Sequence, residues 1–393
     1  MNKYKIPFIA SLFLVLLSAC GGDLTNEISE TENQEETVEK TQTNENIVRQ
    51  NQLGEEYYNF VLDENGNYAT SNSRGITLSL NSGINIRLFE KDLLRFSQQK
   101  FSTDQYFIME GQLLDNNLVR SWLRRLDPEA EGNPLYAGLN PTQDDDFYNE
   151  ETEAYNHSAR IPNYLNSILE LDFYRETEDG VELAGLTIGL AMNTVEYYQA
   201  NDYTQFEQTI APEVALKQGQ NIGNEIVARL REMEGLENIP IMVAIYEQTA
   251  QDDLAGGVYK ALGTSTNGAT SISSWETLNE ERLVFPLEGS SSAEGNAFAN
   301  FQSEVEYYFP NLSGVTGRAH YVNNQLVDLK IDIMTQFYGE TEMISFTQYL
   351  KQSALTFFPA DIDVEINVQS STGMEAFLKK ERTDAEYFAY VFD

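Results

Sequence analysis

The chain of 393 residues contains a single cysteine, Cys20. It comes shortly after an apolar run over residues 6–17, which follows Lys3 and Lys5 and includes Pro7. Because the rest of the chain has no thiol, its folded body cannot contain a disulfide, a cysteine nucleophile or a cysteine-ligated zinc site. The body must be held together by its hydrophobic core alone, and it is long enough for that.

The residues before the cysteine, Leu17, Ser18 and Ala19, form with Cys20 the pattern of a bacterial lipobox. A basic start, an apolar stretch and small residues before a cleavage point are typical of a secretory signal. We predict a signal peptide in residues 1–19, cleavage before Cys20 by signal peptidase II, and a lipid on Cys20. The apolar run is shorter than the about 20 residues that span a bilayer. An ordinary signal peptide with a chance cysteine is the alternative.

Residues 20–58 are predicted to be an acidic tether. After Cys20 this segment is rich in Glu, Thr, Asn and Gln, and ten acidic residues accompany two basic ones. Low hydrophobicity together with a net negative charge is typical of disordered chain. With a lipid on Cys20, the tether would hold the body off the extracytoplasmic face of the cell membrane.

The whole chain is strongly acidic, with 62 acidic and 25 basic residues and a formal net charge of −37. Proteins that bind nucleic acid concentrate lysine and arginine, so the charge excludes nucleic acid as a partner. We interpret the acids as a solvated surface that keeps the protein soluble. Cation buffering is the alternative.

Two tryptophans suggest an internal repeat. Trp122 and Trp275 each follow a serine, and each lies sixteen residues after a tyrosine, Tyr106 and Tyr259. The order of expected elements around these pairs is also similar. We therefore predict an α+β fold of two tandem related repeats, residues 59–238 and 239–393, each a mixed sheet with packed helices. One undivided α+β fold is the alternative.

The expected elements follow from hydrophobic periodicity and turn residues. In the first repeat they are a strand at 76–80, a helix after Pro162, a hairpin of 172–175 with 186–192, and a long helix that stops at Gly235. In the second they are strands at 239–246 and 282–285, a helix ended by Pro310, a hairpin of 318–322 with 326–334, a helix at 341–358, and strands at 361–368 and 386–392.

Motifs for catalysis are weak. His157 ends the acidic loop 144–157, where a divalent cation could bind, but the spacing is not that of an EF-hand and favours a surface insertion. His320 is predicted to be structural. No Gly-x-Ser-x-Gly or phosphate-binding loop occurs. We predict no catalytic residue, metal or cofactor, although a glycosidase-like carboxylate pair stays open.

Aromatic residues are numerous, with 22 tyrosines and 21 phenylalanines. The pairs at 57–58, 197–198 and 307–308 could line a sugar or peptide groove, and half-buried tyrosines on helix faces are the alternative. Gly185 and Gly189 flank a strand, and are predicted to serve its packing rather than a phosphate cradle.

Several segments resemble the CamS family, the lipoprotein precursors of the cAM373-type sex pheromone in Gram-positive bacteria. They cover nearly the whole body, and the family is described as two tandem repeats. Beside the lipobox, the segments that carry the resemblance are LNSGIN at 80–85, KFSTDQYF at 100–107, IGLAMN at 188–193, VFP at 284–286, YFPN at 308–311, QFYG at 336–339 and FTQYL at 346–350.

The resemblance implies that the activity resides in the piece that is removed. A membrane protease would trim the cleaved signal, and a short apolar peptide would reach cells that carry a conjugative plasmid. By position this peptide comes from residues 12–19, as Phe13, Leu14, Val15, Leu16, Leu17, Ser18 and Ala19. The body would then be a non-enzymatic binding or interaction module whose ligand is not identified. An extracytoplasmic lipoprotein that binds a solute or wall fragment, with no pheromone role, is the alternative.

Overall fold

A computed structural model describes residues 48–49, 54–143, 148–149, 154–178, 180–200, 203–287, 292–308, 312–336 and 339–392. They belong to one compact unit, Thr43–Asp393. The helices are α1 (Gly83–Ser97), α2 (Asn116–Trp122), α3 (Pro212–Arg231), α4 (Ala293–Tyr308) and α5 (Glu340–Phe357), and short 3-10 helices lie at Ile76–Ser79, Pro134–Tyr136 and His157–Ala159.

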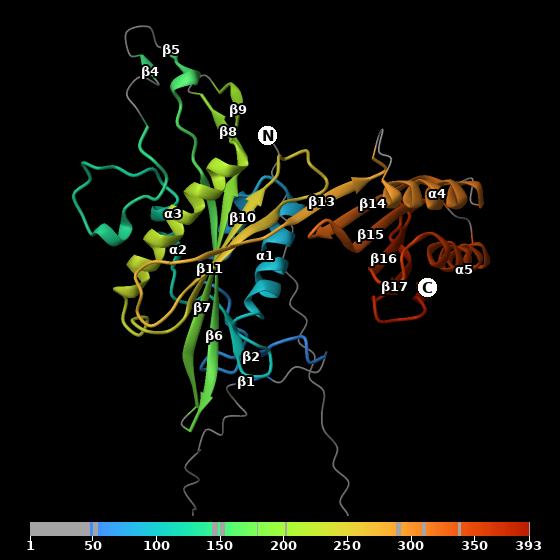
Figure 1. The fold of residues 1–393 in the computed structure, drawn as a ribbon, viewed down its shortest axis with the longest axis horizontal. Helices are drawn as coiled ribbons and strands as arrows, with labels where there is room; N and C mark the ends of the chain where they lie inside the picture. The colour runs from blue at the N-terminus through green and yellow to red at the C-terminus, as the bar shows by residue number, and fades with distance from the viewer. Residues whose placement is uncertain are drawn as a thin grey trace, which may run out of the picture. The chain divides into compact units, whose positions relative to one another are not determined.

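Eight strands form the first sheet in the order β1-β2-β3-β6-β7-β10-β11-β12 (Figure 1). Their bounds are β1 (Val48–Arg49), β2 (Asn59–Val61), β3 (Phe107–Glu110), β6 (Leu165–Thr177), β7 (Gly180–Asn193), β10 (Ile241–Gln248), β11 (Val258–Ser265) and β12 (Trp275–Thr277). Two short hairpins lie outside this sheet, β4 (Tyr148–Asn149) with β5 (Ala154–Tyr155), and β8 (Val195–Gln199) with β9 (Gln205–Thr209).

Helices cover both faces of the first sheet. Phe89, Leu93 and Phe96 of α1 share one core with Ala244 and Tyr246 of β10. On the other face, α2 and α3 pack over β6, β7 and β10. Because β7 is buried from both sides, its sequence is almost continuously apolar instead of alternating.

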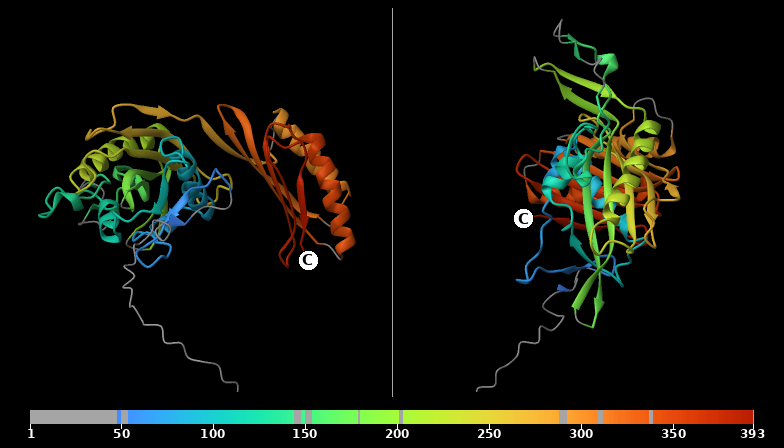
Figure 2. Two further views of the ribbon diagram at one scale, coloured as in Figure 1. Left: turned by 90° about the horizontal axis from the view of Figure 1, so that it is seen from below. Right: turned by 90° about the vertical axis from the view of Figure 1, so that its left-hand side faces the viewer.

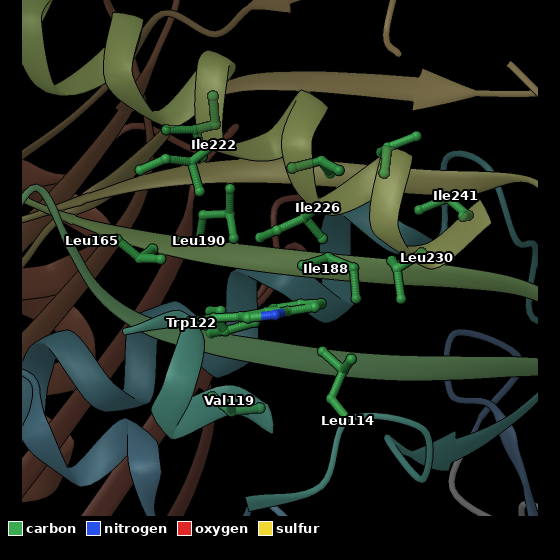
Figure 3. Close-up of a cluster of buried hydrophobic side chains, with 14 of the residues drawn as sticks. Leu114, Val119, Trp122, Leu165, Ile188, Leu190, Ile222, Ile226, Leu230 and Ile241 are labelled. Carbon is green, nitrogen blue, oxygen red and sulfur yellow. The ribbon is translucent and has the colours of Figure 1, made fainter. Parts of the chain in front are cut away.

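Trp122 fills the core between α2 and α3. Its side chain is fully buried, and its indole N–H donates to the carbonyl of Leu135 at 2.6 Å. Figure 3 shows Ile188 of β7 between the Trp122 ring and Ile226 of α3. The apolar residues of α3 recur at helical spacing because this one stripe faces the sheet.

The second sheet has six strands in the order β13-β14-β15-β16-β17-β18. Their bounds are β13 (Glu280–Phe285), β14 (Leu312–Val322), β15 (Gln325–Thr335), β16 (Asp363–Gln369), β17 (Met374–Lys380) and β18 (Phe388–Val391). Helices α4 and α5 cover one face, as the left-hand view of Figure 2 shows. Along β15, Leu329, Ile331 and Ile333 point into this core, while the residues between them are polar.

The two sheets contain the same repeat. The first runs β3-α2-β6-β7-α3-β10-β11-β12, and the second runs β13-α4-β14-β15-α5-β16-β17-β18. Sheet order matches strand for strand, and so does direction. Each series has one parallel pair, β7 with β10 and β15 with β16, and in each a helix connects the paired strands. The prediction of two related α+β repeats with mixed sheets and packed helices is confirmed.

The features that suggested the repeat are not equivalent within it. Trp122 lies on α2, whereas Trp275 begins β12, and both pack in the core of the first sheet. Tyr106 precedes β3 and Tyr259 lies on β11, and these two share the other core of that sheet. The two tryptophans therefore do not occupy matching positions, as a repeat inferred from them would require, although the repeat is present.

The predicted opening strand of the second repeat is β10, which is central in the first sheet. The connection at 238–239 joins α3 to that strand, and the chain passes to the second sheet between Thr277 and Glu280. The helix predicted after Pro162 is also wrong, because β6 occupies that segment. The strand predicted at 76–80 is a 3-10 helix.

Most other predicted elements are confirmed. They include the hairpins β6–β7 and β14–β15, the helices α3, α4 and α5, and the strands β13, β16 and β18. In α5, Met343 is buried, whereas the neighbouring Ile344 is 40% exposed. The predicted tether ends earlier than residue 58, because β1 pairs with β2 and Tyr58 is buried.

The turn between β14 and β15 provides a modest test of the fold. Asn323 and Asn324 both have positive φ, 51° and 63°, in a two-residue hairpin loop. A turn of this kind prefers glycine at its second position. We expect Asn324→Gly to raise the free energy of unfolding by about 0.5–1 kcal/mol and Asn324→Val to lower it by about 1–2 kcal/mol. Urea unfolding checks both, and a valine variant as stable as the parent would contradict this description of the turn.

Candidate functional site

A pocket of about 530 Å³ lies beside α1, and we call it the α1 pocket. This volume is within the range of small-molecule sites. Its walls come from the segment before β2, the 3-10 helix before α1, α1 itself, β3 and β6. The lining residues are Tyr57, Tyr58, Phe60, Tyr68, Ser71, Ser73, Arg74, Thr77, Glu90, Leu94, Ile108, Glu110 and residues 168–171.

One part of the α1 pocket is apolar and aromatic. Tyr58 is buried against Phe173, with ring centroids 5.4 Å apart, and its hydroxyl donates to the carbonyl of Phe101. Phe60 and Tyr68 meet edge to face at 5.8 Å and are partly exposed. Exposed aromatic faces of this kind offer contact to apolar groups and to cations.

Glu110 forms a polar end of the pocket. Its two carboxylate oxygens accept hydrogen bonds from the Tyr68 hydroxyl at 2.7 Å and from the Ser71 backbone N–H at 2.8 Å. The Arg74 guanidinium is 3.9 Å away, with a side chain that is 63% exposed. This carboxylate is therefore held by neutral donors more than by a close ion pair.

Glu90 stands at the exposed rim of the same pocket. Burial raises its pKa, and the negative charge of Glu110 adds to this effect. Its hydrogen bond from the Thr77 hydroxyl is long, at 3.4 Å. Among the described residues, no ion pair within 4.0 Å is found for Glu90. The lining contains three carboxyl groups, Glu90, Glu110 and Glu170, and one guanidinium, Arg74, so its formal charge is −2.

Glu170 and Asp172 on β6 form a buried carboxyl pair, of which Glu170 lines the pocket and Asp172 does not. Burial raises the pKa of both groups, and the nearby Glu170 raises that of Asp172 further. Glu170 accepts the backbone N–H groups of Leu113 and Leu114, at 3.3 and 2.9 Å. Asp172 accepts the N–H of Gln112 at 2.9 Å. The pair fixes the segment between β3 and α2, which is a structural role.

The predicted lipidation and peptide residues lie outside the residues that the structure describes. These are Cys20, the lipobox residues Leu17, Ser18 and Ala19, and the peptide at residues 13–19. The acids of the loop at 144–157, namely Asp144, Asp145, Asp146, Glu150, Glu151 and Glu153, lie outside them too. Within the described part of the chain, no group of three or more potential metal ligands is found.

Both histidines have defined surroundings. His320 is buried, and its Nε2 lies 3.0 Å from Glu280, which confirms the structural role that the sequence predicts. His157 is exposed and packs on Phe206, with the two rings tilted by 32° and their centroids 4.1 Å apart, and its Nδ1 is 2.9 Å from the Tyr198 hydroxyl. Neither histidine lines the α1 pocket.

The aromatic pairs have different fates. Tyr57 and Tyr58 line the α1 pocket, as one interpretation of the sequence expects. Tyr198 instead lies under the Arg160 guanidinium at 3.9 Å. Tyr308 stacks on Tyr349 of α5 at 3.9 Å. Sequence reasoning missed the carboxylates of the pocket, because 62 acids offered no means to single out these two.

The glycines of β7 serve packing, as predicted. A Cβ on Gly185 would overlap the Phe101 ring, and one on Gly189 would lie 2.9 Å from Leu93. The segment at 80–85 is also structural. Asn85 is fully buried in it, and its side-chain oxygen accepts from the backbone N–H of Thr249 and of Gly257 at 3.2 and 2.9 Å.

No helix within the described ranges is long and apolar enough to cross a membrane. A search of curated proteins found no match. Among solved structures, the chain is similar to a sex pheromone precursor from Lactobacillus salivarius subsp. salivarius. The identity is 33% and the TM-score 0.78, over 88% of this chain and 98% of that one.

A second similar structure is the C-terminal domain of the sex pheromone staph-cAM373 precursor from Staphylococcus aureus. Here the identity is 28% and the TM-score 0.67, over 80% of this chain and 99% of that one. Residues 68–386 also match the family described as CamS sex pheromone cAM373 precursor. The match spans both repeats except β18, and most of the α1 pocket. The chain therefore belongs to the CamS family of sex pheromone precursors.

Proposed function

We propose that the protein is a cell-surface lipoprotein, anchored at Cys20, whose cleaved signal peptide yields a short apolar pheromone. The family match over residues 68–386 carries this proposal. The lipobox supports it from the sequence, because it places a cysteine directly after the proposed peptide at residues 13–19. The peptide would be sensed by cells that carry a conjugative plasmid, and it would promote transfer of the plasmid from them.

The chemistry of the peptide suits such a signal. Residues 13–19 carry no charged side chain and five large apolar ones. Burial of apolar surface contributes about 25 cal/mol per Å², so a receptor pocket could bind even a short apolar peptide. Signal peptidase II would cut before Cys20, and a membrane protease would trim the remaining signal.

Mass spectrometry of peptides in the culture medium tests this route. The wild-type strain should release a fragment that ends at Ala19. Cys20→Ser should abolish that fragment and leave the precursor uncut, because signal peptidase II requires the lipid-modified cysteine. A Ser18→Ala strain, which keeps a small residue before the cut, is the matched control and should still release a fragment. If Cys20→Ser releases the fragment as well, the proposed processing is wrong.

The α1 pocket supports a second function for the body, as a non-enzymatic binding module. Its volume and its aromatic wall suit a small ligand. A hydrolase would need a pair of carboxyl groups, and Glu90 and Glu110 both line this pocket, but both oxygens of Glu110 already accept hydrogen bonds. That arrangement favours binding over proton transfer.

A further inference from the structure

The α1 pocket combines an apolar body with an unbalanced negative end. Leu94, Ile108 and the aromatic side chains around Tyr58 form the apolar part. At the polar end two carboxylates accompany one guanidinium, and that guanidinium belongs to a largely exposed side chain. An anionic ligand would therefore meet net repulsion there, and the whole chain, at −37, would add to it.

Glu90 is held more weakly than the other two carboxyl groups of this pocket. Its only hydrogen bond found among the described residues is the long one from Thr77. The two carboxylates repel each other, and the exposed Arg74 guanidinium offsets part of this repulsion. A second cation placed between Glu90 and Glu110 would offset the rest. It would also lie near aromatic faces, which attract ammonium groups at up to about 6 Å from the ring centre.

We propose that the α1 pocket binds a ligand with an apolar body and a primary ammonium group, the free amino end of a short apolar peptide. The ammonium lies between Glu90 and Glu110, and the apolar side chains contact Tyr58, Leu94 and Ile108. This inference rests on the proposal that the body is a binding module, and it does not depend on pheromone release.

A titration of the full chain in detergent tests the ligand class. The probes are the tripeptide amide Phe-Leu-Val with a free amino end, the same peptide acetylated, and phenethylamine. We expect acetylation to weaken binding at least tenfold, because it removes the positive charge. Phenethylamine shares the ammonium and the apolar ring, so binding as tight as the peptide's would support a small amine as the natural ligand and overturn the peptide assignment.

Variants locate the site. Glu90→Gln should weaken binding of the free peptide at least fivefold and leave the acetylated peptide unchanged. Glu234→Gln makes the same charge change at an exposed residue after α3 and should have no effect. Because every variant is titrated in the same detergent, partition of the peptide into micelles affects all of them equally and cancels from the ratio of their affinities. Circular dichroism of each variant confirms that the fold is intact.

The outcomes separate the two proposals. If the acetylated peptide binds as well as the free one, the body is a binding module but the ammonium assignment is wrong. If Glu90→Gln and Glu234→Gln behave alike, the ligand lies elsewhere. If no probe binds, both the ligand class and the binding module are overturned, and the medium assay for the released peptide is unaffected.

Discussion

Replacing Glu170 with leucine is expected to lower the free energy of unfolding by about 3 kcal/mol. The leucine would leave the backbone N–H groups of Leu113 and Leu114 without their acceptors. Each buried donor that loses its partner costs about 1–3 kcal/mol. Tryptophan fluorescence during urea unfolding measures the effect directly, because Trp122 and Trp275 pack in the same sheet as Glu170.

Asp172→Asn is the matched variant. The Oδ2 atom of Asp172 accepts the N–H of Gln112, but no hydrogen bond within the described part of the chain reaches Oδ1. A proton on Oδ1, donated to Glu170, would satisfy both carboxyls, and the raised pKa of Asp172 agrees with this arrangement. An asparagine amide can donate to Glu170 in the same way. We therefore expect Asp172→Asn to keep the stability that Glu170→Leu loses.

The free energy of unfolding should depend on pH through Asp172, and the sign of that dependence follows from its raised pKa. Burial and the charge of Glu170 raise the pKa of Asp172 well above its ordinary value of 3.8. Above pH 3.8 the unfolded chain has lost a proton that the folded chain keeps, so this group lowers stability as the pH rises towards its folded pKa. Asp172→Asn removes the dependence, and its stability relative to wild type should increase between pH 4 and pH 8. A constant difference across that range would show that Asp172 is ionised in the fold.

The apolar residues of β6 explain why a helix was predicted in place of this strand. Tyr164, Ile168 and Leu171 have helical spacing, and this produced the wrong helix. In the structure Ile168 packs in the α2–α3 core, while Leu169 and Leu171 pack against α1. A strand buried on both faces need not alternate apolar and polar residues, so periodicity alone cannot separate it from a helix. The second sheet is covered on one face, its strands do alternate, and its elements other than β17 were predicted.

Long-range placement was the other limit. The α1 pocket draws residues from 57 to 171, and only the tyrosine pair at its start stood out in the sequence. The repeat was detected through Trp122 and Trp275, which are not equivalent in it. What the two halves share is element order and strand direction, and these depend on hydrophobic patterns rather than on one rare residue. The order of the elements could therefore be predicted from the sequence, whereas the equivalent residues of the two repeats could not.

A charged cluster surrounds Glu280, which lies at the start of β13 where the chain enters the second sheet. Its carboxylate accepts two hydrogen bonds from the Arg95 guanidinium of α1, at 3.0 and 2.9 Å, and its Oε2 lies 3.0 Å from His320 Nε2 of β14. Burial alone would raise the pKa of Glu280, but His320 and Arg95 outweigh it and lower the value to about 2. Glu280 thus connects α1, which packs on the first sheet, with β14 of the second sheet.

Glu280→Gln is expected to lower the free energy of unfolding at pH 7 by about 2 kcal/mol. A fall in pKa from 4.5 to about 2 corresponds to roughly 3 kcal/mol, which solvent screening reduces. This stabilisation is present above pH 4.5 and is lost as the pH falls towards 2, because the folded chain then binds the proton as well. The difference between variant and wild type in urea unfolding should shrink over that interval.

Glu281→Gln, at the exposed neighbouring residue, is the control for the same change of charge. It should alter stability by less than about 0.5 kcal/mol. A second readout tests the connection between the repeats. Fluorescence of Trp122 and Trp275 follows the first sheet, whereas far-ultraviolet circular dichroism follows both. If Glu280 couples the repeats, the two transitions coincide in wild type and separate in Glu280→Gln. Transitions that stay coincident in both would mean that Glu280 stabilises its surroundings without coupling the repeats.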